Sequence, residues 1–206
     1  MPRRKAKRQS LLDSMTRQAI QEAVVNLVSL RDTRRITMDE VAAEAGVSKG
    51  CLYLHFRSKK ELLESVKEIS FRPLGDQLQA ILSGSLSPEK KIKDIMHRLL
   101  GYFDENRGLL RFLLEDRELA QSQIKRQKSS RYRSFLERIS RVVEDGVAEG
   151  RFRQLDSGKV ASMLVESTIA MSARRLLDER PAPVEEDARL LMEVFLQGIT
   201  LGSAPQ

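Results

Sequence analysis

Apolar residues in this chain recur at three- and four-residue intervals, and no stretch sustains a strict alternation of apolar and polar positions. Proline and glycine are sparse inside the apolar segments. The pattern therefore predicts an all-α protein of about nine helices, at residues 14–30, 37–45, 48–56, 58–70, 87–103, 106–115, 129–149, 157–179 and 184–201. No apolar run approaches the roughly 20 residues that a membrane-spanning helix needs, so we expect no membrane partner.

Residues 37–56 carry the clearest helix boundaries in the chain. Thr37 suits an N-cap, and Glu40 three residues later completes a capping box. Gly46 stands where a helix commonly ends in a left-handed residue, and Ser48 can cap the next helix. Two short helices joined by such a tight turn have the length of a helix-turn-helix, whose second helix lies in the major groove of DNA.

The second of these helices is expected to have an inward and an outward face. Leu52 and Phe56 form an i, i+4 apolar pair that would hold the helix on the rest of its domain. The opposite arc is mostly short or polar, and Gly50 has no side chain to obstruct approach to the groove. The outward residues are Lys49, Gly50, Cys51, Tyr53 and Leu54, with His55 at the edge.

The excess of positive charge lies at the start of the chain. Residues 1–60 hold 13 Lys and Arg against 6 Asp and Glu, whereas residues 61–206 hold 23 of each, so the first 60 residues carry the whole net charge of +7. A basic segment attracts nucleic acid, although charge alone would suit an anionic membrane surface as well. The basic arm from Arg3 to Arg8 is expected to be disordered without DNA.

The contiguous segment 36–63 resembles the DNA-binding segment of the tetracycline-repressor (TetR) family. The likeness rests on the helix-turn-helix, on the Leu-Tyr-x-His-Phe element at 52–56 and on the Ser-Lys-x-x-Leu element at 58–62. It implies a homodimeric bacterial repressor with an N-terminal helix-turn-helix domain of three helices, at 1–70, and a larger helical ligand-binding and dimerisation domain, at 71–206. One departure is the segment 29–33, which lacks the glycine that members often have after the first helix.

The resemblance implies base contacts at the start of the 48–56 helix and phosphate contacts around it. The base-contacting positions are Lys49, Gly50 and Cys51, of which only Lys49 offers a strong hydrogen-bond donor, for guanine. An outward Tyr53 favours phosphate contact over packing on the scaffold. The phosphate-contacting positions are Thr37, Tyr53, His55 and Lys59, with Ser48 as the helix cap and a further candidate for the DNA backbone.

Cys51 and His55 are four residues apart on one helix, a spacing that also suits a nucleophile pair or a metal site. A structural zinc site needs about four ligands, and the only other histidine is His97. A nucleophile needs a pocket and an orienting group, which an outward helix lacks. We therefore expect no metal, no cofactor and no enzymatic activity. Redox sensing by Cys51 beside Lys49 stays open, with a small groove-facing side chain as the favoured interpretation.

Apolar residues of the C-terminal half fit either a ligand cavity or a packed core, so the ligand-binding residues stay unknown. These residues are Met96, Leu99, Leu100, Phe103, Phe112, Leu113, Met163 and Ile169. Glu166 and His97 are polar residues within apolar helices, and each could orient a ligand or face solvent. The basic stretch 125–133 could dock a partner or simply be solvated.

The last two predicted helices carry broad apolar stripes, and the simplest way to bury them is against their copies across a twofold axis. The stripe of the final helix consists of Leu190, Leu191, Val194, Phe195 and Gly198. The TetR resemblance implies the same homodimer, which would bind a palindromic operator in double-stranded DNA. It also implies release by a small apolar or amphipathic effector. The alternative is a DNA-bound interaction protein of the same fold with no small-molecule effector.

The compartment is expected to be the cytoplasm. The N-terminus has charge but no apolar stretch behind it, so it does not fit the pattern of a secretory signal. The single cysteine excludes an intramolecular disulfide and fits a reducing compartment.

Overall fold

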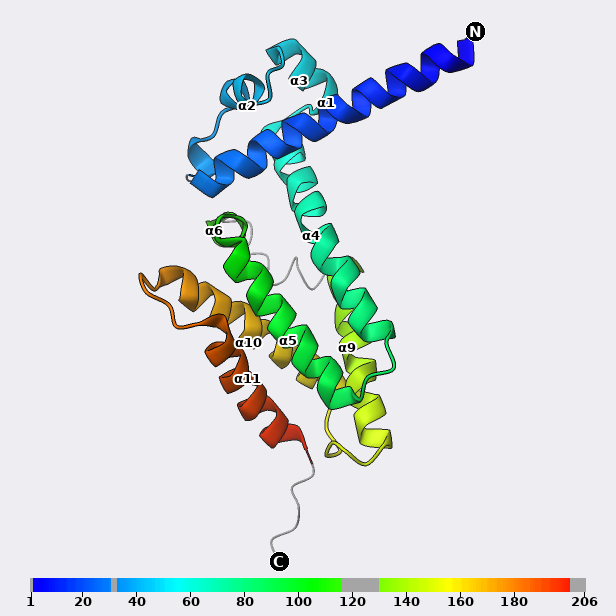
Figure 1. The fold of residues 1–206 in the computed structure, drawn as a ribbon, viewed down its shortest axis with the longest axis vertical. Helices are drawn as coiled ribbons and strands as arrows, with labels where there is room; N and C mark the ends of the chain where they lie inside the picture. Colours follow the sequence, from blue (N-terminus) through cyan, green and yellow to red (C-terminus); the bar gives the residue numbers. More distant parts are fainter. Residues whose placement is uncertain (1, 31–32, 116–129, 201–206) are drawn as a thin grey trace, which may run out of the picture. The chain divides into compact units, whose positions relative to one another are not determined.

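The computed structural model describes residues 2–30, 33–115 and 130–200. Within these ranges the chain forms nine α-helices and one short 3-10 helix, and the only β-pairing is an isolated bridge between Phe152 and Thr200 (Figure 1). The predicted all-α class is therefore confirmed. The helices divide into two compact units, residues 1–72 and 73–206.

The first unit contains the short helices of the predicted helix-turn-helix. Its elements are α1 (Pro2–Leu30), the 3-10 helix η1 (Thr33–Arg35), α2 (Met38–Glu44), α3 (Lys49–His55) and the first part of α4 (Lys59–Ser83). In Figure 1, α2 and α3 lie beside α1 at the blue and cyan end of the chain. Apolar residues of all four helices are buried together: Ile20, Val24, Val41, Leu52, Leu62 and Val66.

The predicted start of the first helix, near Ser14, is wrong, and so is the expectation of a disordered arm. Helix α1 begins at Pro2 and includes residues 3–8. Proline is well accommodated in the first turn of a helix, and the arginines, lysines, glutamine and leucines that follow are good helix formers. No glycine or second proline interrupts them before Ser14.

The predicted end of the fourth helix, near Ser70, is also wrong. Helix α4 runs through Pro73 to Ser83. Proline removes one backbone hydrogen bond inside a helix and usually ends or kinks it. Here Leu74 and Leu78 follow at helical spacing and are only 4% and 5% exposed, so their burial offsets the lost hydrogen bond.

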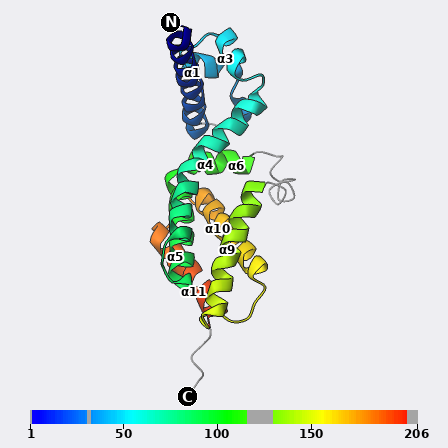
Figure 2. The same ribbon diagram turned by 90° about the vertical axis from the view of Figure 1, so that its right-hand side faces the viewer.

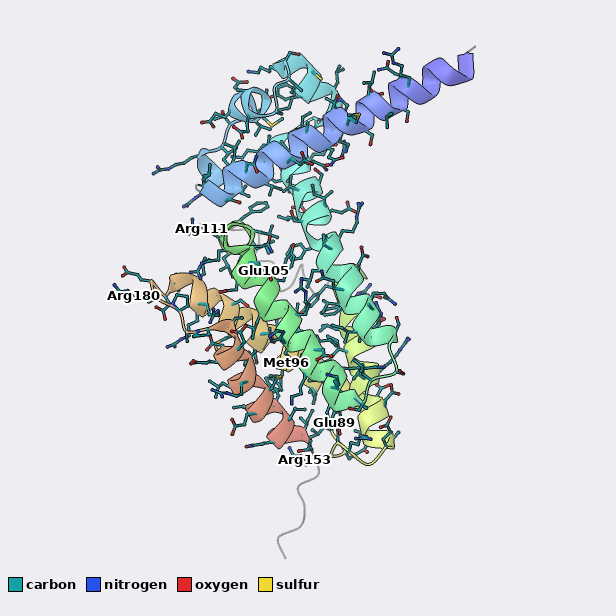
Figure 3. The ribbon with its side chains drawn as sticks, in the orientation of Figure 1. Glu89, Met96, Glu105, Arg111, Arg153 and Arg180 are labelled. Carbon is teal, nitrogen blue, oxygen red and sulfur yellow. The ribbon has the colours of Figure 1, made fainter. Side chains whose placement is uncertain are left out.

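The second unit is built around α5. Its elements are the end of α4, α5 (Pro88–Glu105), α6 (Arg107–Glu115), α9 (Ser130–Ala148), α10 (Ser157–Leu177) and α11 (Val184–Ile199). Helix α5 packs against α9, α10 and α11, as the two views at right angles show (Figures 1 and 2). Met96 lies halfway along α5 and is completely buried (Figure 3). This central position explains why α5 has apolar residues on more than one side.

A buried arginine joins three helices of the second unit. The guanidinium of Arg175, on α10, donates to Asp104 of α5 at 2.8 Å and to Asp187 of α11. Arg175 also donates to the Ala182 carbonyl at 2.8 Å, and the residue is 5% exposed. Burial alone would lower the pKa of Arg175, but its hydrogen bonds to the two aspartates raise that pKa. The cluster therefore keeps its charge and ties α10 to both α5 and α11.

A glycine allows α9 to pack against the chain that leads into α10. The Gly146 carbonyl oxygen accepts hydrogen bonds from the backbone N–H groups of Arg151 and Phe152, at 2.9 and 3.0 Å. The Phe152 ring then lies directly over Gly146, and Phe152 is 2% exposed. The next residue, Arg153, donates its backbone N–H to the Ile199 carbonyl at 2.7 Å, at the C-terminal end of α11 (Figure 3). A side chain at position 146 would therefore disturb α9, the segment that leads into α10 and the C-terminal end of α11.

In the described part of the chain, no helix combines the length and the apolar character needed to cross a membrane.

Candidate nucleic-acid interface

Helices α2 and α3 have the caps that their sequences predict. The Glu40 backbone N–H donates to the Thr37 hydroxyl oxygen at 3.2 Å, and the Thr37 backbone N–H donates to the Glu40 carboxylate at 2.8 Å. The Ser48 hydroxyl oxygen accepts from the Cys51 backbone N–H at 3.1 Å. The capping box and the Ser48 cap are thus confirmed. They fix the first turns of both helices without help from DNA.

The turn between α2 and α3 depends on Gly46. Its φ of +65° lies in the left-handed region, where a residue with a side chain is strained. The Gly46 backbone N–H donates to the Ala43 carbonyl at 3.1 Å, and that of Val47 donates to the Ala42 carbonyl at 2.9 Å. These bonds close the C-terminal end of α2 and turn the chain directly into α3.

The inward side of α3 is held by apolar packing and by an arginine from α1. Leu52 and Phe56 are 0% exposed, as their spacing predicts. The Arg17 side chain donates to the His55 carbonyl at 2.9 Å, and its guanidinium lies 4.1 Å from the centre of the Phe56 ring. A cation at the C-terminal end of a helix also interacts favourably with the helix dipole. Arg17 therefore fastens the end of α3 to α1.

The outward side of α3 presents the residues proposed to meet DNA. Tyr53 is 42% exposed and Leu54 87% exposed, and Lys49 and Gly50 are exposed as well. Cys51 and His55 are half-buried at the edges of this face. The helical periodicity thus predicted the two faces of α3 correctly. None of the exposed residues of α3 is acidic, although the neighbouring helix α2 carries the acidic residue Asp39.

Two predicted phosphate-contacting residues lie at the margins and already have protein partners. The Thr37 hydroxyl donates to the Glu40 carboxylate at 3.0 Å while it also caps α2. The Lys59 ammonium, at the start of α4, donates to the Arg34 carbonyl at 3.4 Å. DNA contact by either side chain would therefore share or replace these hydrogen bonds.

Lys49 is joined to a residue that sequence reasoning missed. Its ammonium nitrogen lies 2.8 Å from Oδ1 and 3.0 Å from Oδ2 of Asp39, the second residue of α2. The side chains are 61% and 65% exposed. The hydrogen bond and the negative charge of Asp39 raise the pKa of Lys49, so the ammonium stays protonated. No local pattern links positions ten apart on two helices, so only the folded turn brings this pair together.

In the second unit, the candidate polar residues have different surroundings. His97 is exposed to solvent, whereas Glu166 of α10 accepts a hydrogen bond from the Tyr132 hydroxyl of α9. Among the apolar candidates, Met163 is 61% exposed, so it does not line an interior cavity of this chain. Most of the others are buried, as in a packed core: Met96, Leu99, Leu100, Phe103 and Phe112. Residues 125–129 of the basic stretch lie outside the described residues.

A small, shallow cleft lies between α5, α6 and α10. Its lining combines apolar side chains with charged ones, and two of the charged residues, Asp104 and Arg175, belong to the buried ion-pair cluster. The lining residues are Phe103, Asp104, Arg107, Leu110, Ser172, Arg175 and Leu176.

Comparison with known proteins agrees with the geometry of the first unit. Residues 20–66 match the family model described as "Bacterial regulatory proteins, tetR family". The match covers the second half of α1, the whole helix-turn-helix and the start of α4.

Relatives and solved structures extend the likeness to most of the chain. The Nucleoid occlusion factor SlmA of Shewanella pealeana is 27% identical over 170 residues, which cover 80% of this chain and 86% of the relative. The TetR family transcriptional regulator PfmR from Thermus thermophilus has a TM-score of 0.70 at 24% identity, over 86% of this chain and 97% of that one. A TetR-like transcriptional regulator from a Rhodococcus species has a TM-score of 0.69 at 25% identity, over 89% and 94% of the two chains.

The first unit and these comparisons define a DNA-binding transcription regulator. A capped helix-turn-helix presents the outward face of α3, which carries no acidic residue, and both the family model and a similar solved structure describe regulators. Residues 20–66 carry the DNA-binding segment of the tetR family of bacterial regulatory proteins, in agreement with the resemblance at residues 36–63.

Proposed function

We propose that this protein is a repressor that binds a palindromic operator as a homodimer and leaves it when a small molecule binds to the second unit. The observation that carries the DNA-binding part is the outward face of α3, with Lys49 at its start and Tyr53 near its middle. In a helix-turn-helix the N-terminal residues of the recognition helix contact base edges. Lys49 would then donate to a guanine, and Tyr53 to a phosphate.

Dimerisation through α10 and α11 is supported by apolar side chains that the single chain leaves uncovered. Met163 and Leu177 on α10 are 61% and 87% exposed, and Leu190 and Val194 on α11 are 52% and 61% exposed. Leu191 belongs to the same predicted stripe but is only 8% exposed, so it packs inside its own chain. The proposed interface is therefore the part of the stripe formed by Leu190, Val194 and Gly198, together with the exposed face of α10.

The DNA-binding proposal predicts that the protein selects a palindromic sequence from a random duplex library. The two half-sites should be separated by about 34–36 Å along the duplex, or a multiple of it, because two α3 helices must meet successive major grooves. Tyr53→Ala should weaken binding to every duplex, whereas Lys49→Ala should cost about 1–3 kcal/mol on the selected duplex and relax its base preference. Gel-shift titrations against selected and shuffled duplexes measure both effects. Failure of the wild type to enrich any sequence would contradict the proposal.

We place the effector at the cleft between α5, α6 and α10. Apolar walls from Phe103, Leu110 and Leu176 suit an apolar or amphipathic molecule, and the exposed part of Arg107 offers a polar contact. The cleft encloses almost no space in this structure, whereas ordinary ligand sites have roughly 300–1,000 Å³, so binding would require it to open. Helix α4 is shared by the two units, and we propose that it transmits the change to α3.

The release mechanism predicts reciprocal coupling between ligand and operator. A ligand found by thermal-shift screening should bind about 5- to 150-fold more weakly when the selected duplex is present, by the same factor with which it weakens DNA binding. Calorimetry with and without duplex measures this factor. Leu176→Trp, which fills the cleft, should remove ligand binding and keep DNA binding.

Equal ligand affinity in both titrations would favour the second candidate, a DNA-bound interaction protein with no small-molecule effector. The similarity to proteins named nucleoid occlusion factors supports that candidate.

A further inference from the structure

The Lys49–Asp39 ion pair is unusual for a surface that is to meet DNA. Both side chains are more than half exposed, so neither the fold of α2 nor that of α3 requires the pair for burial. A carboxylate beside the recognition helix repels phosphates and so opposes sequence-independent binding. Asp39 therefore weakens the electrostatic part of DNA binding.

We propose that Asp39 is a positioning residue that determines specificity: it holds the Lys49 ammonium away from phosphates and presents it to a base edge. This inference rests on the proposed function, in which Lys49 reads a base. Asp39 lies on α2 and Lys49 is the first residue of α3, so the pair spans the turn of the helix-turn-helix.

The chemistry of the lysine side chain explains why it would need such a partner. An ammonium on a flexible four-carbon stem is a point charge with three donors, and without a partner it can move to whichever phosphate is nearest. The Asp39 carboxylate neutralises that charge locally and limits the positions that the nitrogen can reach. The two oxygens of Asp39 lie within 3.0 Å of the Lys49 nitrogen, and each can accept one of its three protons. The third proton remains for the O6 or N7 acceptor of a guanine.

The test compares Asp39→Asn, Lys49→Gln and the double variant with the wild type, on a duplex that the wild type selects from a random library and on a shuffled duplex. Asp39→Asn should bind the shuffled duplex about two- to fivefold more tightly than the wild type does, because the freed lysine contacts phosphates. Its affinity for the selected duplex should increase by a smaller factor. On the shuffled duplex, the slope of log affinity against log salt concentration should become steeper by about one, which corresponds to one more released counterion. In the Lys49→Gln background, Asp39→Asn should leave the ratio of the two affinities unchanged.

Two further variants separate this role from a general effect of charge. Glu44→Gln removes an exposed acidic group from the same helix and should leave the ratio of affinities unchanged. Asp39→Glu can restore the ion pair and should restore the ratio. Circular dichroism of each variant checks that the helices persist.

Equal gains on both duplexes for Asp39→Asn, or the same change of ratio for Glu44→Gln, would overturn the inference. So would an unchanged effect of Asp39→Asn in the Lys49→Gln background. If the wild type selects no sequence at all, the proposed function fails instead, and the two failures are thereby distinguished.

Discussion

Replacement of Val194 by glutamate should convert the protein from dimer to monomer and weaken binding to its selected duplex about a hundredfold or more. Val194 is 61% exposed in the single chain, so the substitution is compatible with folding. In the proposed dimer the side chain becomes buried beside α10 and α11 of the partner, where an unpaired carboxylate is strongly unfavourable. A monomer has one recognition helix and loses the roughly 10²- to 10⁴-fold gain that comes from engaging two half-sites together.

Sedimentation velocity at micromolar concentration and gel shifts measure the two effects of Val194→Glu. Leu86→Glu is a matched control, since Leu86 is a 36% exposed leucine of the same unit and lies just before α5. It should stay dimeric. A wild type that sediments as a monomer, or a dimeric Val194→Glu, would show that the interface lies elsewhere.

Replacement of Gly146 by alanine should destabilise the second unit by about 1–3 kcal/mol. A Cβ atom at this position would lie 2.1 Å from Cδ2 and 2.3 Å from Cε2 of Phe152, far inside van der Waals contact. The ring is buried and its backbone is tied to Gly146, so it cannot move away without loosening the connection to Thr200.

Gly101→Ala is the matched control for Gly146→Ala and should change the free energy of unfolding in the opposite direction. Gly101 is also inside a helix, α5, but a Cβ there would meet nothing within 4 Å. Alanine should therefore stabilise the protein by up to about 1 kcal/mol, as expected for glycine to alanine in a helix. Urea unfolding at one fixed protein concentration measures both free energies. A stabilised Gly146→Ala would mean that the Phe152 ring does not rest on this glycine.

Those features of the first unit that depend on near neighbours in the chain could be predicted from the sequence. The capping box at Thr37, the left-handed Gly46 and the inward pair of α3 each depend on residues at most four apart. Interactions between distant segments could not. Arg17 contacts the end of α3 from 38 residues away, and Asp39 reaches Lys49 across a turn. Neither pair follows a helical period.

The helix ends that were predicted wrongly have a similar cause. A proline usually ends a helix, and the helix predicted at residues 58–70 stops before Pro73. What keeps α4 continuous is the burial of Leu74 and Leu78, which depends on the packing of the second unit rather than on the local sequence. In the same unit, the cluster around Arg175 joins residues from α5, α10 and α11, and no pairwise spacing indicates it.

The attachment of α3 by Arg17 has a consequence for how new operators can be recognised. The Arg17 hydrogen bond is to a backbone carbonyl, and the packing beneath α3 uses Leu52 and Phe56, so neither of these two attachments uses a side chain of the outward face. Mutations at Lys49, Gly50 or Cys51 can therefore accumulate during evolution, or be chosen by an engineer, with little effect on folding. The inward attachment of α3 stays constant while its outward face changes. This is the condition for one scaffold to diverge into regulators of many different genes.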